Sequence, residues 1–440
     1  MFERVFRLRE HNTTPRIELV AGATTFMTMA YIMFVNPAIL SDPRGAGMDF
    51  GAVMAATCVS SAVATLLMGF LANYPIALAP GMGLNAFFSF VICGQMGVPW
   101  QVALGMVFIE GIIFTALSLL KIREEIVNAV PASLKLAAAG GIGLFIAFIG
   151  LKDGGIVKAD PATLVGLGDL HSPPTLLALF GLAVTAVLVA AKVRGALFWG
   201  ILVTGVAGLL TGLVRFSGVA AVPAMGPTFL KMRPLEALRV EYLTPIFVLL
   251  FFDLFDTVGT LVGIGTQGGF MKDGKLPRAG QALLSDAIGT VAGAVCGTST
   301  VTSYIESAAG VGVGGRTGLA NVFTAGLFLV ALFFAPLAQM FGGGCAAPGG
   351  LLLHPVTAPA LVIVGCLMMQ CVAQIRWSDY SEAIPAFLTM IVMPLTNISH
   401  GLAIGFVSYA AVKALSGRWK DVHWLVYCLA GLFVLRYMFI

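Results

Sequence analysis

The chain has 440 residues, of which 58% are hydrophobic and only 10% are charged, whereas about 25% of the residues of a typical soluble domain are charged. Apolar stretches of about 20 residues, the length of a membrane-spanning helix, recur from Ile17 to the C-terminus. The composition therefore predicts a multi-pass membrane protein, and the net charge of +4 is no sign of nucleic-acid binding.

The positions of Lys and Arg indicate which ends of the predicted helices face the cytoplasm, because positive charge concentrates on that side. With a cytoplasmic N-terminus, the inner segments hold the basic residues of 1–16, 121–123, 192–194 and 272–278. Residues 1–16 contain no cleavable apolar core. We therefore expect the first spanning helix to direct insertion into the cell membrane. The opposite side holds mostly Arg44, Lys152, Lys158, Lys231, Arg233 and Arg239.

The hydropathy pattern predicts about fourteen spanning segments in two halves of seven. After a cytoplasmic N-terminus at 1–16, the first half (17–216) has segments near 17–40, 51–73, 75–92, 97–121, 132–151, 175–192 and 195–216. A hydrophilic linker at 217–241 precedes the second half (242–440), with segments near 242–266, 279–297, 298–312, 317–341, 355–376, 383–412 and 421–440. The stretch 383–412 contains Pro394 and Gly401, so it is either one helix or two short ones.

An odd number of crossings in each half gives the two halves opposite orientations, as in inverted-repeat transporters. The third segment of each half is irregular: 74–88 begins with two prolines and two glycines, and 297–310 begins with a β-prone, hydroxyl-rich run. We expect each to be a half-helix preceded by a short strand. Irregular backbone at that depth is stable only where it is buried in protein or lines a cavity, which predicts a binding site at mid-membrane.

The eighth segment carries two aspartates in an otherwise apolar run. Asp253 and Asp256 are three residues apart, and Thr257 and Thr260 each follow one of them by four, so a helix places all four on one polar stripe. A carboxylate in the middle of a bilayer costs at least about 2.5 kcal/mol, so a pair of them predicts a cavity. Two carboxylates one turn apart do not both ionise easily, which predicts a proton site.

Asn85 on the first broken segment and Glu306 on the second join Asp253 and Asp256 as candidate binding residues. These segments contain no basic residue that would neutralise the three acids. A cation, a proton or a ligand rich in N–H groups must therefore do so. The alternative is a structural polar network that locks the helices together.

Several other features carry weaker predictions. The hydroxyl cluster of 298–303, which includes Thr298 and Thr302, either lines the site or satisfies the broken backbone. The glycine run 310–318 lacks a βαβ context, so it predicts a tight turn rather than a nucleotide site. Glu110 in the fourth segment is expected to serve helix packing. The histidines and cysteines show no ligand spacing, so neither a metal nor a cofactor is expected.

Three motifs resemble those of AzgA-like purine permeases, a branch of the nucleobase/cation symporter (nucleobase/ascorbate transporter) superfamily that also includes uracil and xanthine permeases. They are GLNAFF at 83–88, FDLFDTVGTL at 252–261 and GTSTVTSYIESAAG at 297–310, which runs on to GRTGL at 315–319. The stretches 24–37 and 382–387 also fit, so the resemblance covers nearly the whole chain.

The resemblance implies a uracil-permease-like, all-α fold of two inverted repeats. A substrate-carrying core would be built from 17–121 and 242–341, and a gate from 132–216 and 355–440. It also implies that hypoxanthine, guanine or adenine is imported by proton symport, through an elevator-like movement of core against gate. Membership of the superfamily is compatible with a homodimer.

The resemblance also implies roles for particular residues. The substrate-binding acids of the family match Asp256 and Glu306, with Asp253 and Asn85 contributing. In uracil permeases a histidine follows the eighth-helix acid by four residues, where this chain has Thr260. Proton coupling is therefore expected at the three carboxylates.

Two rival functions stay open at this point. An anion transporter or channel of the same architecture fits the crossings, but three acids without a basic residue in the site oppose it. A membrane enzyme or scaffold would fit a chain in which no transported solute is found, although no nucleophile or metal constellation supports it. Purine uptake that is insensitive to chloride and sulfate would exclude the anion transporter.

Overall fold

The computed structural model describes residues 2–120, 130–222, 224–271, 276–346 and 352–439. The chain divides into two compact units, one of residues 1–119 and 151–360 and the other of residues 120–150 and 361–440. Both are mostly helical, and each is described by itself. The predicted division into core and gate domains remains a prediction.

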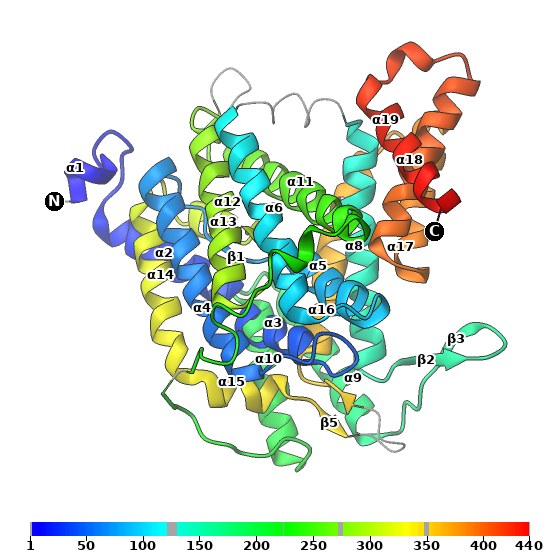
Figure 1. Ribbon diagram of the computed structural model, residues 1–440. Coiled ribbons are helices and arrows are strands. Elements are labelled where there is room, and N and C mark those ends of the chain that lie inside the picture. The colour runs from blue at the N-terminus through cyan, green and yellow to red at the C-terminus, as the bar shows by residue number, and fades with distance from the viewer. Residues whose placement is uncertain (1, 121–129, 223, 272–275, 347–351, 440) are drawn as a thin grey trace. The chain divides into compact units, whose positions relative to one another are not determined.

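The helices of the first half follow in order along the chain. They are α1 (Phe2–Phe6), α2 (Pro15–Met29), α3 (Ile32–Ser41), α4 (Phe50–Leu67) with a π-helical end at Met68–Ala72, α5 (Met82–Ala86) with a π-helical continuation at Phe87–Gln95, α6 (Trp100–Leu120), α8 (Ala132–Asp153), α9 (Pro173–Ala190) and α10 (Ala196–Leu210). A hairpin of β2 (Val157–Asp160) and β3 (Leu164–Leu167) follows α8 and extends away from the helices in Figure 1.

The second half begins after short 3-10 turns at Glu236–Leu238 and Val240–Tyr242. Its helices are α11 (Leu243–Gln267), α12 (Ala279–Cys296), α13 (Ser307–Gly312), α14 (Leu319–Ala331), α15 (Ala335–Gly342), α16 (Ala358–Met368), α17 (Tyr380–Leu395), α18 (Ile398–Leu415) and α19 (Trp424–Phe439). Further 3-10 turns lie at Leu332–Phe334, Met369–Gln374 and Trp419–Asp421, and β5 (Cys345–Ala346) pairs with β6 (Leu352–Leu353).

Within the described ranges, nine helical stretches are long and apolar enough to cross a membrane, and five apolar helices are shorter. The sum of fourteen agrees with the sequence prediction, but the composition differs at two places. The expected segment 298–312 contains only a six-residue helix, α13. The stretch 383–412 is two helices, because Pro394 lies near the end of α17 and Asn397 caps α18 by accepting a bond from the His400 N–H at 2.9 Å.

The two irregular segments pair with each other as antiparallel strands. Strand β1 (Leu78–Pro80) lies before α5, and β4 (Val301–Ser303) lies before α13, with Ala79 opposite Thr302. Proline excludes helix from the first strand, and β-branched residues favour extended backbone in the second. Figure 1 shows β1 within the bundle, next to α4 and α12. The expected half-helices preceded by short strands are confirmed.

Side chains satisfy the broken backbone, as buried irregular segments require. The Asn321 amide on α14 donates to the carbonyl oxygens of Thr65, Tyr74 and Ile76 at 3.1, 3.0 and 2.8 Å. Thr65 also accepts from the Leu78 N–H at 3.0 Å. Because Asn321 belongs to the second half and the carbonyls belong to the first, the two halves complete each other.

A buried carboxylate holds the start of α14. Glu18 on α2 is fully buried and accepts from the backbone N–H groups of Arg316, Thr317 and Ala320 at 3.0, 3.4 and 3.2 Å. These groups belong to the first turn of α14 and the residues before it, where N–H groups lack partners inside the helix and a negative charge is favourable. The glycine run 310–318 thus leads into a capped helix.

Replacing Glu18 by alanine is expected to lower the free energy of unfolding by about 2–4 kcal/mol, because three buried N–H groups lose a charged acceptor. Thermal unfolding of the purified protein in detergent measures the loss. Glu10→Ala removes the same charge from an exposed side chain whose contact with Arg7 is a surface ion pair, and it should change stability by less than about 1 kcal/mol. Equal losses in both variants would show that Glu18 acts only as a charge.

An ion-pair network ties the end of α3 to the end of α8. Arg44 lies 2.5 Å from Asp42 and 2.8 Å from Asp153. Burial alone would raise the pKa of Asp42, but the hydrogen bonds from the Arg44 side chain and backbone outweigh it and hold this pKa below its ordinary value. Asp42 therefore stabilises the fold above the ordinary aspartate pKa of about 3.9.

This stabilisation is expected to disappear as the pH falls through the lowered pKa of Asp42. Melting temperatures measured between neutral and strongly acidic pH should fall for the wild type, and Asp42→Asn should lack the part of that fall due to this carboxylate. The variant should also be less stable at neutral pH. An identical acid response in both proteins would contradict the role of the Arg44 contact.

The second unit contains an antiparallel helix pair, α17 and α18, which lie side by side in Figure 1. The Lys413 ammonium on α18 is buried and lies 2.5 Å from Glu382 on α17. Glu382 also accepts bonds from Ser133 and Tyr409. Since both charges have partners, this network is a structural contact within the unit.

Candidate functional site

Asp256 lies on α11 and is exposed, although it is in the middle of a predicted span. Its Oδ2 accepts a hydrogen bond from Thr302 Oγ1 at 3.4 Å. Thr302 is buried on β4, where its hydroxyl also lies 2.8 Å from that of Thr257. Strand β4 thus brings the Thr302 hydroxyl, from the second broken segment, to Asp256 on α11.

Glu306 directly precedes α13 and is half-buried. Its Oε1 accepts from the buried Tyr31 hydroxyl at 2.7 Å, and its carbonyl accepts from Thr28 Oγ1 at 3.2 Å. Tyr31 lies between α2 and α3, so the first half orients this acid of the second half. The carboxyl groups of Glu306 and Asp256 are near enough to interact electrostatically. The structure therefore brings the two predicted acids together on an open side of the unit.

Asn85 lies on α5 and is fully buried. Its Oδ1 accepts from the Ser299 hydroxyl, whereas its Nδ2 makes no hydrogen bond within the described part of the chain. Thr298 is also buried and accepts from the side-chain amide of Asn36 on α3 at 2.9 Å. Thr298 is thus bonded to the scaffold. An unpaired buried amide is costly, so the free Nδ2 group of Asn85 is suited to a ligand or water acceptor.

Asp253 is fully buried, unlike Asp256 one turn along the same helix. Its Oδ2 accepts from Thr290 Oγ1 on α12 at 3.3 Å. Its carboxyl group also interacts with that of Glu110 on α6. The polar stripe predicted from spacing therefore faces two environments, one open and one closed.

The closed environment holds two acids that the sequence analysis did not place in the site. Glu110 accepts a hydrogen bond from Thr300 Oγ1 at 2.9 Å. It therefore contacts the second broken segment, in addition to the helix packing expected for it. Asp286 on α12 is fully buried and faces Asp253. Each is the only charged residue of its spanning helix, and that isolation is the sequence signal that identifies intramembrane functional acids.

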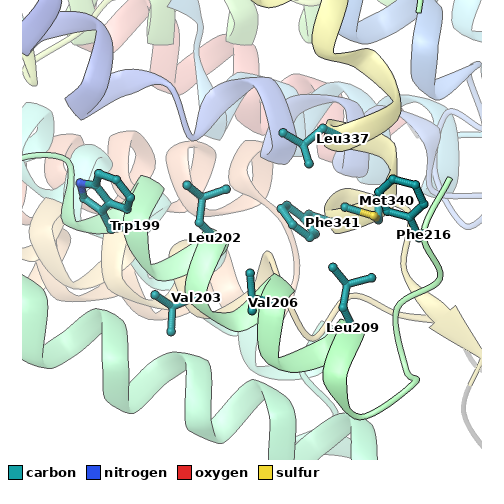
Figure 2. A pocket seen from close by; sticks show the side chains of 9 residues that line it. All are labelled: Trp199, Leu202, Val203, Val206, Leu209, Phe216, Leu337, Met340 and Phe341. Atoms are coloured by element: carbon teal, nitrogen blue, oxygen red, sulfur yellow. The ribbon is translucent and has the colours of Figure 1, made fainter. Parts of the chain in front are cut away.

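A groove of about 550 Å³ lies between α10 and the region of α15. Figure 2 shows Leu202, Val206 and Phe341 among its lining residues, which are all apolar or aromatic. Such a lining offers a purine almost no partner for its N–H and carbonyl groups. This groove therefore does not suit a polar ligand, which the acids on α11 and Glu306 suit better.

Residues 16–401 match the family model described as the permease family. The chain belongs to this permease family. A putative permease of Methanocaldococcus jannaschii is 52% identical over 442 residues, covering 100% of this chain and 98% of that protein.

Other relatives of this permease carry substrate names. A guanine/hypoxanthine permease of Bacillus subtilis is 47% identical, over 99% of each chain. An adenine permease of Escherichia coli is 42% identical, over 100% of this chain and 96% of that protein. The resemblance to purine permeases of the nucleobase/ascorbate transporter superfamily is confirmed, and the permease is a transporter and not an enzyme.

Solved transporters share the fold of this permease. The transmembrane domain of a cyanobacterium bicarbonate transporter superposes with a TM-score of 0.63 at 18% identity, over 88% of this chain and 96% of that one. The murine anion transporter Solute Carrier 26 family member A9 gives 0.62 at 10% identity, over 91% and 68%. These likenesses concern the fold alone, and they confirm the predicted inverted-repeat class.

Proposed function

We propose that this permease imports purine nucleobases, namely hypoxanthine, guanine or adenine, by proton symport. The observation that carries the proposal is the pair of carboxyl groups of Asp256 and Glu306 on the open side of the first unit. The guanine/hypoxanthine and adenine permeases among its relatives support the same substrate class.

The chemistry of the pair suits a purine. A purine edge alternates N–H donors with carbonyl or ring-nitrogen acceptors, and a carboxylate accepts the N–H groups through charge-assisted bonds. In this proposal Asp256 and Glu306 accept from the base, and the free amide of Asn85 donates to it. Thr302, Thr298 and Asp253 complete the set: Thr302 orients Asp256 through its hydroxyl, while the buried Thr298 and Asp253 support the site from the scaffold.

The coupled proton is proposed to reside on the carboxyl groups of Asp256, Asp253 and Glu306. Carboxyl groups that interact at low dielectric favour uptake of a proton, and the same groups receive the N–H donors of the base, so proton binding and purine binding are linked. In the proposed cycle an elevator-like movement of a core against a gate carries both solutes. The proposed transporter lies in the cell membrane with a cytoplasmic N-terminus, and it functions as a homodimer.

Uptake of labelled hypoxanthine, guanine and adenine into cells that express the chain tests the proposal. Accumulation of a base that a protonophore abolishes, and that chloride and sulfate do not inhibit, is the expected result. Cells with an empty vector provide the background. Absence of uptake of all three bases by protein detected in the membrane would overturn the proposal, and inhibition by the anions would favour the anion-transporter alternative.

A further inference from the structure

A second group of acids lies next to Asp256, and this group is closed to solvent. Glu110 on α6, Asp253 on α11 and Asp286 on α12 are each 0% exposed. Four of their six carboxyl oxygens make no hydrogen bond to any residue that the structure describes: Oε1 of Glu110, Oδ1 of Asp253 and both oxygens of Asp286. The remaining two accept from Thr300 and Thr290. The polar side chains that contact this cluster therefore leave most of its oxygens without partners.

Among the described residues, the groups that interact with the cluster include no positive charge. In the described parts of the chain, none of the ion pairs involves these three carboxyl groups. The groups that face the cluster are hydroxyls and a further acid, Asp256. Buried, unpaired carboxylates are among the most costly groups in a protein interior, and they become neutral before they are tolerated.

The unpaired oxygens of Glu110, Asp253 and Asp286 indicate how these acids become neutral. An ionised carboxylate is only an acceptor, so neighbouring buried carboxyl groups that lack other donors bond to one another only when one of them is protonated. A protonated carboxyl group donates to a free oxygen of its neighbour, and Asp286 provides two such oxygens. Protons therefore supply the donors that the side chains around the cluster lack.

We propose that Glu110, Asp253 and Asp286 form a closed proton-holding site, distinct from the open acids Asp256 and Glu306. Asp253 and Asp256 lie one turn apart on α11 and interact electrostatically, which links the closed site to the open one. Its use in transport rests on the proposed proton symport of purines. The open acids Asp256 and Glu306 contact the base and share its coupled proton, whereas Glu110 and Asp286 hold protons without contacting the base, and Asp253 links the two groups.

Transport assays of Glu110→Gln and Asp286→Asn test this division. Purine binding should stay within about threefold of wild type, since neither residue contacts the base and a threefold change is well below 1 kcal/mol. Exchange of labelled for unlabelled base should persist, whereas protonophore-sensitive accumulation should fall by about tenfold or more. Wild-type accumulation with wild-type pH dependence in both variants would overturn the proposal. Failure of the wild type to transport any purine would instead count against the proposed function.

Infrared spectroscopy of the purified full-length protein provides a second readout that needs no purine. The wild type at neutral pH should show absorption from protonated carboxyl groups, and this absorption should decrease in Glu110→Gln and in Asp286→Asn. Sodium ions should leave it unchanged. Absence of protonated carboxyl absorption in the wild type, or its loss on addition of sodium, would overturn the proposal, and the second outcome would identify an alkali-cation site.

Discussion

Replacing Glu306 by glutamine is expected to weaken purine binding by about 100-fold or more. A charge-assisted bond to the carboxylate is worth about 1.5–3 kcal/mol, and the amide also presents a donor where the base presents N–H groups. The buried Tyr31 hydroxyl, 2.7 Å from Oε1, would still orient the side chain. Direct binding of labelled hypoxanthine, guanine and adenine to the purified variant measures the loss.

Tyr31→Phe is the matched control for Glu306→Gln. It removes the bond that positions the carboxylate and leaves the charge in place, so affinity should fall by no more than about tenfold. Both variants should elute from gel filtration as the wild type does, which separates a lost contact from misfolding. Wild-type affinity in Glu306→Gln would remove Glu306 from the binding site.

Replacing Asp256 by asparagine is expected to abolish the dependence of purine uptake on the proton gradient. Asparagine cannot take up a proton. It retains an oxygen that can accept the hydrogen bond from Thr302 Oγ1, which lies 3.4 Å from Oδ2 of Asp256 in the wild type. Accumulation should fall by about 5- to 150-fold, which corresponds to the loss of a coupling free energy of about 1–3 kcal/mol. Uptake over a range of external pH, with and without a protonophore, measures the change.

Thr260→Val is the control on the same helix. Thr260 lies four residues beyond Asp256, where the resemblance to uracil permeases would place a histidine. If the carboxyl groups carry the proton, the valine variant should keep pH-dependent accumulation within about threefold of wild type, a change below 1 kcal/mol. Unchanged pH dependence in Asp256→Asn, or its loss in Thr260→Val, would contradict the assignment to Asp256.

The residue types along the chain predicted the helices and strands better than they predicted which segments pair with each other. Pro75, Pro80 and the neighbouring glycines exclude a continuous helix, so the first broken segment could be placed from the sequence alone. The β-branched run of the second segment predicted a strand. The register that places Ala79 opposite Thr302 joins residues from the two halves, and single-sequence patterns contain no information on such long-range pairing.

The sequence predicted only those relations between site residues that lie on one helix. Helical spacing placed Asp253 and Asp256 on one stripe, but it could not show that Asp256 is open while Asp253 is enclosed by α6 and α12. Glu110 and Asp286 each stand alone in an apolar span, and only tertiary structure brings them to Asp253. The spacing predicted the pair of acids on α11, and the fold places them in two environments, one open and one closed.

The hydrogen bonds of Asn321 also bear on how the protein is made. The carbonyls of Tyr74 and Ile76 belong to the first broken segment, and their donor lies about 250 residues later in the chain. The first half is therefore synthesised before the amide that pairs with these two carbonyls exists. Until α14 brings Asn321 to them, these two carbonyls need another donor, such as water.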